Sequence, residues 1–162
     1  RFHNPGDEAV EAVFSFHARN FMAVTPPDRG TPPADAVLAT KGGFTLWQPG
    51  SEARSFDQGA FSATVDDPEV RVNHAWFRGG WFDSPTMVWK SVAEGDMPEG
   101  APISEGPPSP GGSLYVPVRL APGESKTVVV PLTWHVPNTD LRLGADSEDG
   151  PACCSCSGTH QP

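Results

Sequence analysis

The sequence has few cations and no cluster of them. It contains 11 lysine and arginine residues against 20 aspartate and glutamate residues, which gives a formal net charge of −9. Nucleic acids and anionic membranes are bound through clustered Lys and Arg side chains, so neither partner is expected. The sequence also lacks an apolar run of about 20 residues, the length of a membrane-spanning helix, and it lacks a signal peptide. These absences predict a soluble protein without a transmembrane segment.

Cysteine is scarce and confined to one short stretch, at Cys153, Cys154 and Cys156. A disulfide between two sheets needs cysteines far apart in the sequence, and unpaired thiols favour the cytoplasm. Cys153 and Cys156 form a C-x2-C pair followed by His160, which is a weak zinc candidate because a second pair is missing. We therefore expect no metal site and no cofactor. The chain starts at Arg1 beside a strand, so we expect a truncated N-terminus whose targeting segment, if any, lies upstream.

Periodic helices are also scarce, whereas 19 prolines and 17 glycines provide turns and strand ends. Short alternating segments predict strands, and one segment with Ser84 as N-cap and Gly95 as stop predicts a helix. The predicted strands lie at 9–19, 36–48 (a hairpin turning at 41–43), 59–67, 69–77 and 113–120, and the helix at 84–95. This pattern predicts one all-β domain, an antiparallel β-sandwich with long Pro/Gly-rich loops and at most one short helix.

The strongest alternation, at 124–136, places Val128, Val130, Leu132, Trp134 and Val136 on every second position. It follows the strand at 113–120 after a Pro-Gly turn, so the two segments are predicted to form a hairpin. We assign residues 1–144 to the sandwich domain. Residues 145–162 are acidic, rich in small residues and unpatterned, and we expect a linker or a disordered tail there.

The common catalytic motifs are missing. The paired carboxylates Asp66 and Asp67 lie in a turn without apolar surroundings, whereas a catalytic acid needs burial or a neighbouring charge to raise its pKa. There is no G-x-S-x-G motif, and His17 and His135 lie on the polar faces of predicted strands. The glycine pairs lack the strand–loop–helix context of a phosphate-binding loop. We therefore expect no catalytic residue in this chain.

Aromatic residues cluster between positions 76 and 89, with charged residues among them. Aromatic rings beside charged donors grip sugar rings, because the C–H faces stack and the hydroxyls form hydrogen bonds. The same residue types dominate protein cores and interfaces between domains, so both interpretations stay open. The candidates for a carbohydrate site or a domain interface are Trp76, Arg78, Trp81, Asp83 and Trp89.

The order of several motifs resembles a known family. "MVWKSVAEGDM" runs from Met87 to Met97 and ends in an acidic-Gly turn, and "SLYVPVRLAPGESKTVVVPLTWHVPN" follows at 113–138. The second stretch contains an L-x-P-G-E turn and a strand that ends in Trp-x-x-Pro. Together with "FSFHARN" at 14–20, this order resembles the N-terminal domain of glycoside hydrolase family 116. That family includes bile-acid β-glucosidase, also called non-lysosomal glucosylceramidase.

The resemblance implies a retaining β-glucosidase whose two catalytic carboxylates lie in a following (α/α)6 barrel. Retention requires two carboxyl groups about 5 Å apart, and the resemblance carries neither of them into this chain. It implies a non-catalytic domain that packs on and supports the barrel of its own polypeptide, with β-glucosides or glycolipids as substrates.

The alternative is a free-standing carbohydrate-binding or adhesion sandwich that uses Trp76, Trp81 and Trp89 as its platform. Exposed, coplanar rings at these positions would favour that alternative. Buried rings, or rings on a broad apolar face, would favour domain packing. A small hydrolase in its own right has the least support in the sequence.

Overall fold

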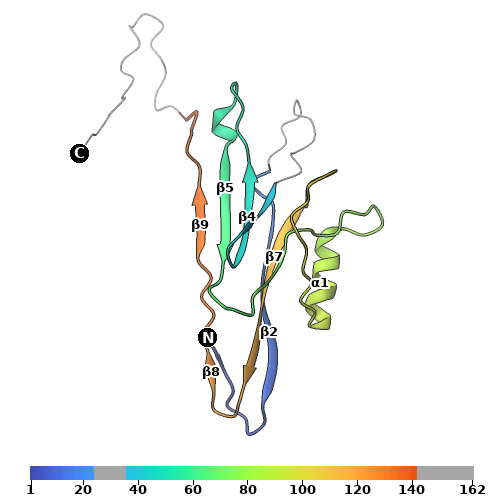
Figure 1. Cartoon of the computed structure of the whole chain (residues 1–162), viewed down its shortest axis with the longest axis vertical. Helices are drawn as coiled ribbons and strands as arrows, with labels where there is room; N and C mark the ends of the chain where they lie inside the picture. Colours follow the sequence, from blue (N-terminus) through green and yellow to red (C-terminus); the bar gives the residue numbers. More distant parts are fainter. Residues whose placement is uncertain (24–35, 142–162) are drawn as a thin grey trace, which may run out of the picture.

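The computed structural model describes residues 1–23 and 36–141, which form three antiparallel sheets (Figure 1). The strand orders are β3-β4-β5-β9, β2-β7-β6 and β1-β8. The elements are β1 (Phe2–His3), β2 (Val10–Arg19), β3 (Val37–Thr40), β4 (Gly43–Gln48), the 3-10 turn η1 (Ser55–Asp57), β5 (Gly59–Thr64), β6 (Arg71–Asn73), α1 (Ser84–Glu94), β7 (Gly111–Leu120), β8 (Ser125–Lys126) and β9 (Leu132–His135). The predicted all-β sandwich is confirmed, with a single α-helix among the described residues.

The core lies between the four-stranded and the three-stranded sheet. Phe44 and Leu46 of β4 are fully buried in it, and Leu114 and Val116 of β7 meet them from the other sheet. The ring of Phe16 in β2 stacks on that of Phe44 with centroids 6.4 Å apart. Complete burial of a large apolar side chain contributes about 1.5–3 kcal/mol, so this cluster supplies a large part of the stability.

The central strand β7 is buried on both of its faces. It pairs with β2 along its whole length, from Leu120 opposite Val10 to Gly111 opposite Arg19, and with β6 over a shorter stretch. One face of β7 packs into the core, and Gly112 there leaves room for the Phe44 ring, since a Cβ would lie 2.8 Å from it. The helix α1 lies on the other side of β7 from β4 and β5 (Figure 1).

A partly polar cluster occupies the face of β2 and β7 that is turned away from the core. Ser113 is fully buried and accepts a hydrogen bond of 2.8 Å from the indole N–H of Trp76, and its Oγ lies 2.8 Å from Nδ1 of His17. The other ring nitrogen of His17 lies 2.9 Å from Oγ of Ser15, and the ring packs edge-on against Tyr115 at 5.5 Å. Burial lowers the pKa of His17, because it disfavours the charged imidazolium.

The predicted hairpin between 113–120 and 124–136 is wrong. The partners of β7 are β2 and β6, and the segment 124–136 instead contributes two short strands to two other sheets. β8 pairs with β1, and β9 pairs with β5, while Val128 and Val130 between them pack against the core. Alternation fixes which side chains share a face, but it does not fix the partner strand. The chain therefore crosses from one sheet to the other where a second hairpin strand was expected.

The other turn predictions are largely confirmed. The hairpin at 36–48 turns at Gly42, which has a φ of 71°, and a Cβ there would lie 2.2 Å from the Val65 carbonyl oxygen. Gly95 ends the helix in the left-handed conformation, as expected. The predicted N-cap Ser84 is wrong by one position, because Asp83 caps the helix and its Oδ1 accepts the Thr86 N–H at 2.9 Å.

Leu114→Ala should lower the free energy of unfolding by about 2–5 kcal/mol, because it removes buried methyl groups and leaves a cavity in a filled core. Leu141→Ala is the matched control, since that side chain is largely exposed and should change stability by less than about 0.5 kcal/mol. Urea denaturation measures both values. Equal losses in the two variants would contradict the assignment of the core.

His17 should make the domain less stable in mild acid. The unfolded chain takes up a proton near the ordinary histidine pKa of about 6.5, whereas the folded chain resists it. The free energy of unfolding should therefore fall as the pH is lowered through that value, until the pH also passes the lowered pKa of His17. His17→Gln should remove this component in urea denaturations between about pH 5 and 8. His135→Gln, at an exposed position of β9, should retain it, and identical pH profiles of the two variants would refute the role of His17.

Candidate interaction surfaces

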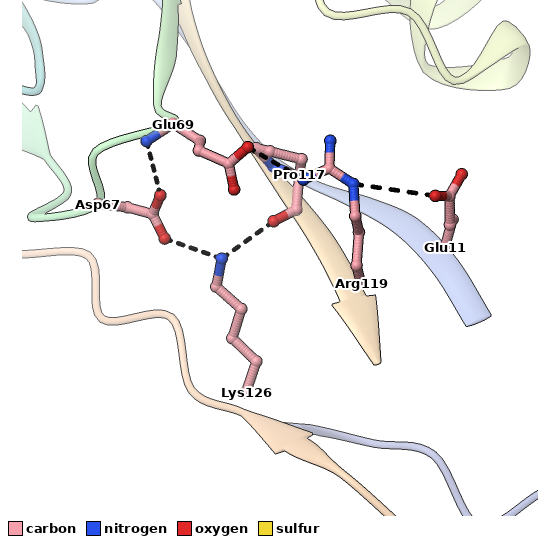
Figure 2. A network of polar contacts seen from close by, with 6 residues as sticks. All are labelled: Glu11, Asp67, Glu69, Pro117, Arg119 and Lys126. Carbon is pink, nitrogen blue, oxygen red and sulfur yellow. Dashed lines mark hydrogen bonds and ion pairs between the residues drawn. The ribbon is translucent and has the colours of Figure 1, made fainter. Parts of the chain in front are cut away.

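The carboxylate that the sequence placed in a solvated turn has a specific partner. The Asp67 side chain is only 14% exposed, and its Oδ2 lies 2.9 Å from Nζ of Lys126 (Figure 2). The same ammonium donates to the Pro117 carbonyl oxygen at 3.0 Å. The backbone N–H of Glu69 donates to Asp67 Oδ1 at 2.9 Å. These contacts join the turn before β6, the middle of β7 and β8.

The remainder of this network is more exposed. Arg119 lies 3.0 Å from a carboxylate oxygen of Glu69 and 3.8 Å from one of Glu11 (Figure 2), and more than half of each side chain is in solvent, so these pairs add little stability. The hydrogen bond from Lys126 is the main cause that lowers the pKa of Asp67. A general acid needs the opposite shift. The network therefore holds these elements of the fold together and does not form an acid/base pair.

The contact between Ser113 and His17 lacks the features of a catalytic dyad. Ser113 is fully buried, so no substrate carbonyl can reach its hydroxyl. His17 has Ser15, not a carboxylate, at its second ring nitrogen, whereas a triad uses an acidic residue there. These residues fix β2, β7 and Trp76 relative to one another.

In the structure, one tryptophan of the predicted aromatic cluster is buried and the other two are exposed. Trp76 is 5% exposed and hydrogen-bonded to Ser113, so it belongs to the interior. Trp81 is 92% exposed, and Trp89 of α1 is 72% exposed. Phe82 beside Trp81 is also mostly exposed. The three tryptophans thus do not form one platform, and only two of them can contact a ligand or another domain.

The two charged members of the predicted set hold the loop before α1. The Arg78 guanidinium donates to the Pro107 carbonyl oxygen. Asp83 accepts from the backbone N–H and the hydroxyl of Thr86, at 2.9 and 2.7 Å, and these hydrogen bonds lower its pKa. Arg78 and Asp83 therefore anchor the segment that carries Trp81. We call the exposed aromatic residues of this region, Trp81, Phe82 and Trp89, the α1 ridge.

A second exposed apolar surface lies along β9. Leu132 is 55% and Trp134 68% exposed, and Val136 directly after the strand is about half exposed. The half-exposed ring of Phe21 packs edge-on against Trp134 at 6.2 Å and against Phe61 at 5.0 Å. We call Phe21, Leu132, Trp134 and Val136 the β9 flank.

The sequence analysis placed Trp134 among the alternating apolar residues of a strand but did not identify an exposed surface around it. One sequence feature could have indicated it: residues 127–138 contain no Asp, Glu, Lys or Arg, although 19% of the chain is charged. No comparable feature marks Phe21, which is distant in sequence and reaches the flank only through the fold.

No group of three or more metal-ligating side chains comes together within residues 1–23 and 36–141. The weak zinc candidates Cys153, Cys156 and His160 lie outside the described residues, as does the predicted linker at 145–162. In the same described part of the chain, no helix has the length and apolar character to cross a membrane.

Comparison with known proteins identifies the family. Residues 1–149 match the family model described as "beta-glucosidase 2, glycosyl-hydrolase family 116 N-term". No curated protein matches the chain. The match covers nearly all of the sequence, including every described strand and the helix. The chain therefore belongs to the family of N-terminal domains of glycosyl-hydrolase family 116.

Proposed function

We propose that this chain is the non-catalytic N-terminal domain of a β-glucosidase-like glycoside hydrolase and that it packs on and supports the catalytic domain of the same polypeptide. Membership of the family implies a catalytic domain elsewhere in that polypeptide. The observation that carries the proposal is the number of large apolar side chains left in solvent by a domain that already has a set of fully buried core residues, namely Trp81, Trp89, Leu132 and Trp134. These side chains lie on two separate surfaces, and exposed apolar patches on a soluble protein mark interaction sites.

The energetics favour such packing. Burial of one exposed tryptophan or leucine side chain contributes about 1.5–3 kcal/mol. An interface that covers several of them gains several times that amount, before the costs of ordering side chains and polar groups. Tethering in one chain removes most of the cost of bringing the partners together.

The chemistry of the parent protein follows the family. We propose an (α/α)6 barrel as the catalytic domain, a retaining mechanism, and β-glucosides, including glycolipids, as substrates. Residues 1–144 would form the supporting domain and 145–162 the linker. The bunched cysteines, without a distant partner in the sequence, support a cytoplasmic location.

A second candidate function is sugar contact at the α1 ridge. The nearly complete exposure of Trp81 favours it, because a free indole face stacks on the C–H face of a pyranose ring. The loop that carries Trp81 is anchored by Arg78 and Asp83. The site would use two indole rings, since Trp76 is buried.

The isolated 162-residue chain should not hydrolyse an aryl β-glucoside, whereas the full-length polypeptide should. Removal of residues 1–141 from the full-length polypeptide should lower the melting temperature of the catalytic domain by several degrees, because the interface is lost. Calorimetry and a glucoside assay measure both effects. Turnover by the isolated chain, or a catalytic domain equally stable without residues 1–141, would refute the proposal.

Sugar contact at the α1 ridge is testable in the isolated chain. Trp81→Ala and Trp89→Ala should each weaken binding of cellobiose roughly threefold to tenfold, because each removes one stacking face. Isothermal titration calorimetry gives the dissociation constants. Trp134→Ala is the control, since it removes a mostly exposed indole from β9, which lies on the opposite side of the domain from α1 (Figure 1), and should leave binding unchanged. Equal effects of all three substitutions would eliminate this second function.

A further inference from the structure

The apolar side chains of β9 are exposed although they are on the inward side of their sheet. In the pairing of β5 with β9, Leu132 lies opposite Ala63 and Trp134 opposite Phe61. Residues opposite each other in a sheet project on the same side. Ala63 is fully buried in the core, and Phe61 packs against it. Leu132 and Trp134 thus continue the core surface of the sheet, yet more than half of each side chain is in solvent.

The reason is a mismatch in the widths of the two facing sheets. The sheet β3-β4-β5-β9 has four strands, and the sheet β2-β7-β6 that covers its core side has three. Phe16 of β2 and Gly112 of β7 both pack over Phe44 of β4, two strands away from β9. Among the described residues, the aromatic contact with Trp134 comes from Phe21. Within the described part of the chain, the core side of the four-stranded sheet is therefore left exposed along the β9 flank.

The chemistry of this opening favours a protein partner over a small polar ligand. The stretch 127–138 has no charged residue, and depletion of charge with enrichment of Trp and Phe is typical of the centre of a protein interface. The α1 ridge differs, because Arg78, Asp83, Lys90 and Glu94 lie among or beside its aromatic residues.

The backbone of β9 is poorly suited to pairing with a further strand. The strand is four residues long, and Pro131 and Pro137 flank it. Short edge strands and prolines limit the addition of another strand to a sheet. A partner would therefore contact the side chains of the β9 flank and not extend the sheet.

We propose that the β9 flank is the surface on which the catalytic domain docks and that apolar side chains of that domain close the open side of the core. This inference rests on the proposed function. It also rests on chain order: an N-terminal domain precedes its catalytic domain, β9 is the last strand that the structure describes, and the described chain ends at residue 141, six residues after β9. A tethered partner has its highest effective concentration near the point of attachment.

The test compares two substitutions in the full-length polypeptide. Trp134→Glu places a charge in the proposed interface, and Trp89→Glu places one on the α1 ridge at a tryptophan of similar exposure. Loss of a central aromatic contact should accelerate proteolytic cleavage between the domains by roughly tenfold or more in Trp134→Glu. Small-angle X-ray scattering should show an increased radius of gyration for that variant. Trp89→Glu should match the wild type in both measurements.

A second measurement separates undocking from misfolding. Trp134→Glu in the 162-residue chain should retain the wild-type circular dichroism and melting temperature, because the side chain is mostly exposed there. Two outcomes would overturn the inference and leave the proposed function intact. In the first, Trp89→Glu separates the domains and Trp134→Glu does not. In the second, neither substitution separates them. Wild-type domains that scatter as two independent bodies would instead overturn the proposed function itself.

Discussion

The pairing of β2 with β7 is the constraint on which the other features depend. It joins Val10–Arg19 to Gly111–Leu120 without interruption. It also makes β7 the central strand of its sheet, with β2 and β6 as neighbours and with both faces of the strand buried. Pro117 is tolerated in this central strand because β6 ends its pairing at Tyr115, so among the described strands β2 alone pairs with β7 at that point. The free carbonyl of Pro117 is then available to Lys126, which fixes the point at which the chain crosses between the sheets.

The two exposed apolar surfaces follow from how the faces of the sheets are covered. On the outer face of β7, Trp76 is buried and hydrogen-bonded to Ser113, whereas the next tryptophans along the chain, Trp81 and Trp89, remain in solvent. On the inner side, the narrower sheet leaves Leu132 and Trp134 uncovered. One surface is aromatic with charges nearby and suits a wet contact, whereas the other is free of charge and suits a permanent one. A single domain can thus combine support of a partner with contact to a ligand.

Sequence patterns predicted local structure well and long-range partners poorly. Alternation identified β2 and β7, and turn chemistry identified Gly42 and the helix stop at Gly95, because these depend on neighbouring residues alone. The hairpin partner of β7 was wrong, since alternation at 124–136 suits either sheet. Within the aromatic cluster nothing in the sequence distinguished buried Trp76 from exposed Trp81, because Ser113, which binds the Trp76 indole, is far away in the chain. The Lys126 partner of Asp67 was missed for the same reason.

The register of β2 with β7 also determines when the domain can assemble. Val10 pairs with Leu120, and Phe2 pairs with Lys126. The first strands therefore emerge from the ribosome long before their partner strands have been synthesised. The hairpin of β3 and β4 and its neighbour β5 need only local segments and can form earlier. During synthesis β2 therefore has no partner strand, and its apolar side chains are exposed to other nascent chains until nearly the whole domain has been made. Molecules that bind extended apolar segments at that stage would find β2 before any other strand of the three-stranded sheet.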